Sequence, residues 1–181
     1  MSTDAATRRM LLAIARNAIA AAVGGTKAPN APAAAILLEQ RGVFVTLTRA
    51  GRLRGCIGRI QADIPLASLL PLMAAAAATE DPRFPAVTPG ELDGLHIEIS
   101  LLTPLTPLVD PTTIQIGRHG LMVSARGRRG VLLPQVATEY GWSAEEFLAQ
   151  TCRKAMLPMD AWQHEGVQVH TFESEIIAVE I

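Results

Sequence analysis

The segment with the densest chemistry is residues 52–59, which read Arg-Leu-Arg-Gly-Cys-Ile-Gly-Arg. Cationic side chains beside a thiol favour the thiolate, which is the nucleophilic form of cysteine. The flanking residues Gly55 and Gly58 let backbone amides approach a ligand or let a strand bulge. One interpretation is therefore an activated Cys56 in a pocket that accepts anions, with Arg54 holding the anion.

The same segment also has a purely structural interpretation. If the strand alternates regularly, Arg52, Arg54 and Cys56 share one face, and Leu53, Gly55 and Ile57 share the other. Cys56 could then be a small buried hydrophobe in a glycine-bent hairpin, with the arginines in solvent. No histidine lies nearby in the sequence to act as a base, so both interpretations stay open.

Two further segments carry candidate site residues. Asp81 and Arg83 lie on a turn with two prolines, which could aim a carboxylate and a guanidinium into a cleft, or could form an ion pair that pins a loop. Glu98 and Ser100 lie on one face of an alternating strand. A carboxylate there could act as a general base, or the face could simply be solvated.

Cysteine and histidine counts bear on metals and compartment. The two cysteines, Cys56 and Cys152, are too few and too far apart for a disulfide framework or a zinc pair, which indicates a reducing cytoplasm. We interpret Cys152 as structural, because it lies on the apolar side of its helix. The four histidines are scattered without metal-ligand spacing. We therefore predict no metal and no cofactor.

The composition excludes several classes of protein. The 181 residues suit about one domain, and 49% of them are apolar while only 18% are charged, which argues against disorder. A net charge of −1 argues against a nucleic-acid binder. The twin arginines near the N-terminus are not followed by an uninterrupted apolar run, so we expect no export signal. The apolar segment Leu66–Ala78 is too short to span a bilayer, so we expect no membrane-spanning helix and no association with a membrane.

Periodicity predicts the elements that position these residues. We expect a helix over residues 4–23 that ends at two glycines, a hairpin of strands over 42–48 and 52–60, and a helix from Pro65 to about Thr79 with a kink or break near Leu70, because Pro71 lies inside it.

The second half continues in the same mixed pattern. We expect strands at 95–102, 114–116, 121–125 and 131–133, a turn at 127–130, and a helix over 144–156 after a capping box of Ser143 and Glu146. A long strand or a strand pair over 166–181 closes the chain. The fold class is therefore α+β, with an antiparallel sheet flanked by helices.

An ordered series of motifs resembles one known family. It comprises Leu53-Arg-Gly-Cys-Ile-Gly58, Asp81-Pro-Arg-Phe84, Glu98-Ile-Ser100, His119-Gly-Leu121, Leu132-Leu-Pro-Gln-Val136, Gly141-Trp142, Phe147-Leu148 and Lys154-Ala155. The series resembles the AMMECR-type domain family, named after the chromosomal region of Alport syndrome with elliptocytosis. The likeness covers essentially the whole chain, and the LRGCIG hexapeptide is specific for the family. Met156 departs from it, since glycine is more usual there.

The resemblance implies a single domain over residues 1–181 with two unequal lobes, the larger built from both termini, and a cleft between the lobes lined by the hexapeptide. It supplies no reaction. It implies one set of functional residues: Arg54, Gly55, Cys56, Gly58, Asp81, Arg83, Glu98, Ser100 and His119. Of these, Cys56, Glu98 and His119 are the catalytic candidates, and the others are ligand-binding candidates.

Two functions follow as hypotheses. In the first, the domain binds a small polar or anionic molecule or a protein partner, and the resemblance implies a Memo-type or radical S-adenosylmethionine protein in a modification pathway. In the second, the chain is an enzyme that uses Cys56 as a nucleophile or modified thiol. We favour the first, because the chain offers no complete catalytic set.

Overall fold

The chain divides into two units in the computed structural model, which describes residues 3–178. Unit 1 comprises Met1–Leu102 and Glu175–Ile181, and unit 2 comprises Thr103–Ser174. Helices and antiparallel strands occur in both units, which confirms the predicted α+β class. The strand order is β2-β1-β3-β7-β5-β6, and β4 pairs with β7.

Unit 1 carries two long helices and a hairpin. Its elements are α1 (Ala5–Gly24), η1 (Ala35–Leu38), β1 (Val43–Arg49), β2 (Arg52–Arg59), α2 (Leu66–Thr79), η2 (Pro89–Gly94) and β3 (Leu95–Leu102). Asp4 caps the start of α1 by accepting the Thr7 N–H, and Gly25 ends the helix at a φ of 65°. The predicted break in α2 is wrong, because the helix continues through Pro71. Proline has no N–H group, so Pro71 leaves only one helical carbonyl, that of Ala67, without its usual donor.

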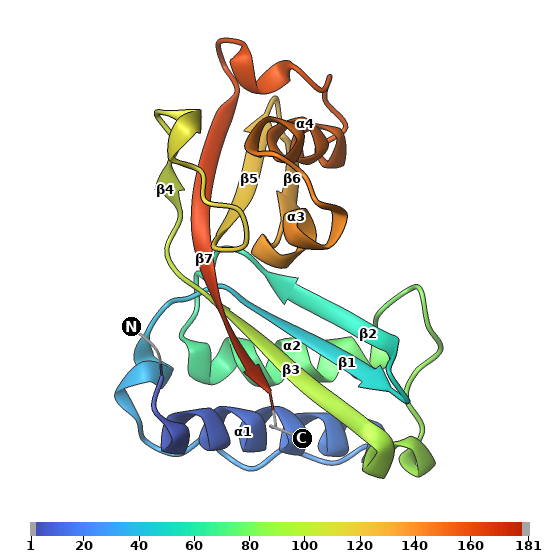
Figure 1. The fold of residues 1–181 in the computed structure, drawn as a ribbon. Coiled ribbons are helices and arrows are strands. Elements are labelled where there is room, and N and C mark those ends of the chain that lie inside the picture. The colour runs from blue at the N-terminus through green and yellow to red at the C-terminus, as the bar shows by residue number, and fades with distance from the viewer. Residues whose placement is uncertain (1–2, 179–181) are drawn as a thin grey trace. The chain divides into compact units, whose positions relative to one another are not determined.

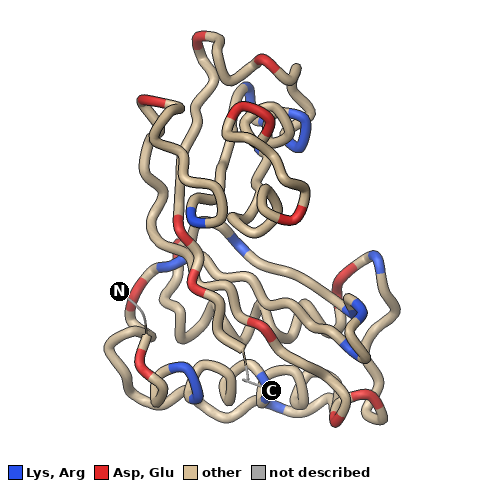
Figure 2. Tube along the Cα trace, viewed as in Figure 1, with Lys and Arg blue, Asp and Glu red and all other residues tan. Residues whose placement is uncertain are grey.

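Both long helices cover the same face of the sheet in unit 1 (Figure 1). The strands alternate, so one face is apolar, with Val45 and Leu47 of β1 and Ile97 and Ile99 of β3 packed in one core with both helices. The opposite side chains form what we call the polar face: Thr46, Thr48, Cys56, His96, Glu98 and Ser100. Within this unit, acidic and basic residues are interspersed along the trace (Figure 2).

Unit 2 is built around a hairpin and two helices. Its elements are β4 (Thr106–Pro107), η3 (Pro111–Thr113), β5 (His119–Ala125), β6 (Arg128–Leu132), α3 (Pro134–Tyr140), α4 (Ala144–Lys154) and η4 (Ala161–Gln163), and β7 (Gln168–Ala178) runs from this unit into unit 1. The capping box of Ser143 and Glu146 at the start of α4 is confirmed.

Two expectations for unit 2 are wrong, and one helix was missed. Residues 114–116 form no strand, because Ile114 follows a 3-10 turn and packs into the core with Phe147. The turn expected at 127–130 is a two-residue turn of Arg126 and Gly127, with φ of 51° and 77°, so β6 begins three residues earlier than expected. Helix α3 was not expected, although Pro134 is a favourable first helical residue.

Candidate functional site

Three polar side chains lie in a row across the strands of unit 1. Cys56 of β2 is paired with Thr46 of β1, and Thr46 is paired with Glu98 of β3. Side chains of paired residues lie on the same face of a sheet, about 5 Å apart from strand to strand. The Thr46 hydroxyl donates a hydrogen bond to the Cys56 Sγ at 3.2 Å, and Cys56 is only partly buried. The row therefore brings together two predicted site residues, Cys56 and Glu98, with a hydroxyl between them.

A pocket of about 280 Å³ opens at the Thr46 and Glu98 end of this row. Its lining includes Thr48 and His96 from the polar face and Arg16 from α1. Neither Arg16 nor Glu98 forms an ion pair with another of the residues that the structure describes. The pocket thus offers one carboxylate and one guanidinium, together with hydroxyl groups, to a ligand.

A β-bulge at Arg54 breaks the alternation expected for residues 52–59. Leu47 pairs with Gly55 but Thr48 pairs with Leu53, so Arg54 is the extra residue. Arg52 pairs with Arg49, which is not on the polar face. The expectation that Arg52, Arg54 and Cys56 share one face is therefore wrong, because the bulge shifts the register between Leu53 and Gly55 and so puts Arg52 and Cys56 on opposite faces.

Arg54 is occupied by hydrogen bonds within the protein. Its Nε donates to Glu91 Oε1 at 2.9 Å and its Nη2 to Glu91 Oε2 at 3.2 Å, while Nη1 and Nη2 reach the carbonyls of Pro85 and Ala86. These bonds and the Thr88 N–H lower the pKa of Glu91 to about 2. Arg54 thereby fixes the loop that follows α2 to the bulge, and it has few donors left for an anion.

Asp81 and Arg83 cover the outer edge of β2 at Cys56. The Asp81 carboxylate accepts the Cys56 N–H at 2.8 Å, and Arg83 Nη2 donates to the Cys56 carbonyl at 3.3 Å. The two side chains are joined by bonds of 3.0 and 2.7 Å. Asp81 is buried, and the guanidinium lowers its pKa well below its usual range. Because β2 is an edge strand, this pair satisfies backbone groups that would otherwise lack strand partners.

The two glycines of the hexapeptide allow close packing. A Cβ at Gly55 would lie 2.0 Å from the Ala77 carbonyl oxygen of α2, and a Cβ at Gly58 would lie 2.3 Å from the Phe44 ring. Ser100 pairs with Phe44 in the neighbouring strand and is buried. All three residues therefore lie around the row. Gly55 lets α2 pack closely on β2, and Gly58 makes room for the Phe44 ring, whose strand partner is Ser100.

His119 is the one predicted site residue in unit 2. It begins β5, and its Nδ1 accepts the Gln115 N–H at 3.2 Å. Sequence reasoning missed Arg16, Thr46, Thr48 and His96. The alternation of Thr46 and Thr48 in the first hairpin strand was the available signal, since a hairpin places them beside Cys56.

Comparisons with known proteins assign the family. The AMMECR1 family model matches residues 12–177. The chain belongs to the AMMECR1 family. A protein of Methanothermobacter thermautotrophicus is 47% identical over 176 residues, covering 93% of this chain and 92% of its own. One of Thermofilum pendens is 48% identical over 157 residues, covering 77% and 73%.

A solved crystal structure has a similar fold. The crystal structure of an uncharacterized protein from Pyrococcus horikoshii matches with a TM-score of 0.84 and 42% identity, covering 92% of this chain and 88% of that one. None of the names of these relatives states an activity. The hexapeptide, the row and the loop after α2 all lie within the matched residues.

Two absences within the described residues concern metal ions and membranes. Within residues 3–178, no three His, Cys, Asp or Glu side chains are grouped so as to hold a metal ion. No helix in that range is both long and apolar enough to cross a membrane.

Proposed function

We propose that the AMMECR1 domain binds a small polar ligand in the pocket beside Cys56. The observation that carries this proposal is the row of Cys56, Thr46 and Glu98, which ends at a pocket with two charged side chains, Glu98 and Arg16, that form no ion pair within residues 3–178. A pocket of about 280 Å³ suits a small molecule.

The charges of the pocket indicate which ligand it would take. Glu98 would accept from an ammonium or hydroxyl group, and Arg16 would donate to a carboxylate or phosphate. Arg54 and Asp81 support this function indirectly, because they hold β2 and its neighbouring loop in place. Any anion would therefore be held by Arg16, in contrast to the role that the motif suggested for Arg54.

Three probes of similar size test this proposal. Ethanolamine carries an ammonium group, glycolate a carboxylate and serine both, and each can be titrated into ¹⁵N-labelled protein while the backbone amide signals are followed by NMR. We expect serine to shift the signals of Thr46, His96 and Glu98 most strongly. Glu98→Gln should abolish the response to ethanolamine, and Arg16→Met the response to glycolate.

The matched control is Arg9→Met, which alters an exposed arginine on the same helix that does not line the pocket beside Cys56. It should respond like the unaltered protein. If none of the probes shifts signals of the polar face, or if all three variants behave alike, the proposal is wrong.

A cysteine-dependent enzyme is the second candidate. The specific observation in its favour is that Cys56 is partly exposed and contacts a hydroxyl group at 3.2 Å, an arrangement open to a reagent. The rate of alkylation by iodoacetamide against pH tests it. A nucleophilic role requires a midpoint well below the value of about 8.5 for an ordinary thiol, and a midpoint at or above that value contradicts the role.

The partner and the location rest on other grounds. Association with a Memo-type or radical S-adenosylmethionine protein is supported by the family resemblance, and the cytoplasmic location by the two unpaired cysteines. Calorimetric titration with each purified partner tests the first, and absence of binding at micromolar concentrations would reject it.

A further inference from the structure

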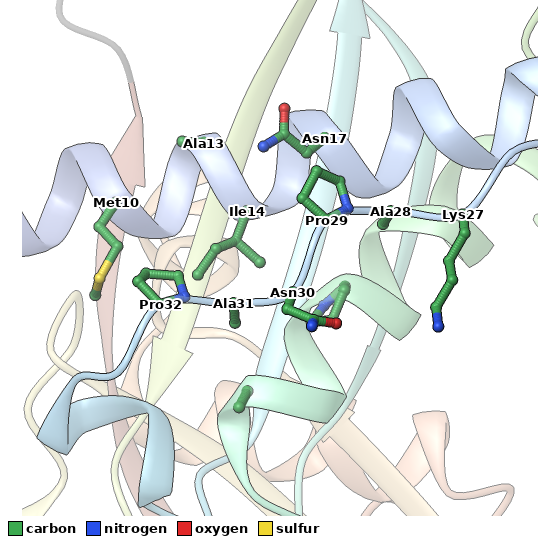
Figure 3. Close-up of a pocket in the computed structure, with 12 residues that line it drawn as sticks. Met10, Ala13, Ile14, Asn17, Lys27, Ala28, Pro29, Asn30, Ala31 and Pro32 are labelled. Carbon is green, nitrogen blue, oxygen red and sulfur yellow. The ribbon is translucent and has the colours of Figure 1, made fainter.

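We propose that a second pocket in unit 1 binds an N-acylated apolar amino acid. This pocket is lined by α1, by α2 and by residues 27–32, which run alongside α1 and which we call the crossing segment because they connect α1 to the rest of unit 1 (Figure 3). Its volume is about 410 Å³, within the range of small-molecule sites. It shares no lining residue with the pocket beside Cys56. The inference is therefore independent of the function proposed above.

The walls of the pocket are apolar and rigid. Met10 and Ile14 contribute from α1, and Pro29 and Pro32 contribute from the crossing segment (Figure 3). Ile14 extends from the helix toward that segment (Figure 3). Proline fixes the backbone φ angle, so the segment loses little conformational freedom when a ligand binds. These residues would contact a branched alkyl or aromatic side chain.

Two polar side chains of the crossing segment add specificity. Lys27 and Asn30 line the pocket. Neither forms an ion pair or hydrogen bond with another of the residues that the structure describes. An ammonium group and an amide N–H group are both donors suited to a carboxylate. The pocket thus combines an apolar body with one anionic position.

Helix α2 supplies the third feature, a carbonyl group that lacks its helical partner. Ala67 and Pro71 both line the pocket, and they are four residues apart in α2. Proline has no N–H, so Pro71 cannot donate to the carbonyl of Ala67. A ligand N–H can take the place of that missing donor. An acylated amino acid offers all three complementary groups: an amide N–H, a carboxylate and an apolar side chain.

A pair of probes tests the assignment by NMR titration of the whole chain. N-acetyl-leucine carries all three groups, whereas 4-methylpentanoate has the same branched body and carboxylate without the N–H. We expect N-acetyl-leucine to bind about tenfold more tightly, with shifts at Ile14, Ala31 and Ala67.

Pro71→Ala is the decisive variant. It gives residue 71 an N–H for the Ala67 carbonyl and a residue of higher helix propensity, so the helix stays folded. The advantage of N-acetyl-leucine over 4-methylpentanoate should then disappear. Persistence of that advantage would overturn the role of the carbonyl.

The two lysines of the chain provide a test variant and a matched control for the role of the Lys27 charge in binding the carboxylate. Lys27→Met should weaken both probes about tenfold, and Lys154→Met, in unit 2, should leave both unchanged. Equal behaviour of the two variants would overturn the proposal. An acetylated pentapeptide ending in leucine distinguishes the source of the ligand, because binding much tighter than that of N-acetyl-leucine would point to a protein C-terminus and against a small molecule.

Discussion

The two cysteines of the chain lie in contrasting surroundings. Cys152 of α4 is fully buried in a cluster with Val123 and Ala161, and this burial raises the pKa of its thiol. Cys56 of β2 is partly exposed, and its sulfur contacts the Thr46 hydroxyl. The sequence neighbours of both include basic residues. The difference teaches that adjacent charges do not decide whether a thiol is accessible: Cys152 lies on the buried face of a helix, whereas Cys56 lies on the polar face of a sheet.

Both cysteines nevertheless depend on a glycine that lets a helix approach a strand. Gly55 admits the Ala77 carbonyl of α2 beside Cys56, and Gly130 admits the Ala155 N–H group of α4 near Cys152. A Cβ would meet backbone atoms in both places, and backbone yields less easily than a flexible side chain.

The largest effect is expected for Gly55→Ala. The added Cβ would lie 2.0 Å from the Ala77 carbonyl oxygen, so β2 and α2 must separate, and we expect a loss of about 3 kcal/mol or more in the free energy of unfolding. Urea denaturation measures it. Gly90→Ala is the control, because a Cβ there meets nothing within 4 Å. Equal stability of the two variants would contradict the packing described for β2.

Asp81→Asn is expected to rank second. It removes the charge that Arg83 pairs with and weakens the cover over the Cys56 backbone, so we expect a loss of about 2–3 kcal/mol in unfolding free energy. Asp63→Asn should cost less than about 0.5 kcal/mol, since the ion pair of Asp63 with Arg59 is exposed. Urea denaturation again measures both losses. A small effect of Asp81→Asn would show that the position of Arg83 over the Cys56 backbone does not depend on the Asp81 charge.

These contacts mark the limit of what the sequence could predict. The helices at 4–23 and 144–156, the first hairpin and the α+β class follow from periodicity and local capping, which act over a few residues. The hairpin could have placed Thr46 beside Cys56, but the bulge at Arg54 and the position of Arg16 depend on packing between elements distant in the sequence, which no local pattern encodes. The sequence therefore suggested Cys56 and Glu98 as candidates but missed Arg16 and Thr48 as pocket-lining residues.

Acidic pH should weaken unit 1 through two carboxylates. The pKa values of Asp81 and Glu91 are lowered by Arg83 and Arg54, so both groups stabilise the fold above about pH 4 to 5, the range of the unfolded chain. That stability is lost as the pH falls toward 2. We expect the unfolding free energy to decline steadily between pH 5 and 3 in urea titrations.

Glu91→Gln is the control for the pH dependence. The variant should be less stable at pH 7 and should decline less steeply below pH 5, because one of the two titrating groups is gone. A slope unchanged from the unaltered protein would assign the acid sensitivity to other carboxylates.

The smallest effect on stability is expected for Thr46→Val. The hydroxyl contacts a thiol, which is a weak hydrogen-bond partner, so the loss should be below about 1 kcal/mol. The rate at which iodoacetamide alkylates Cys56 should nevertheless change, whereas Thr48→Val should leave it unaltered. Identical rates in the two variants would mean that the contact does not affect the thiol.

Ligand protection of the two thiols tests the central claim most directly. Native protein is alkylated with iodoacetamide, with and without serine, and each cysteine is quantified by peptide mass spectrometry. We predict that Cys56 reacts and Cys152 does not until urea is added, that saturating serine slows Cys56 several-fold, and that Glu98→Gln abolishes this protection. Comparable rates at both cysteines, or a Cys56 rate indifferent to serine, would contradict a ligand site beside Cys56.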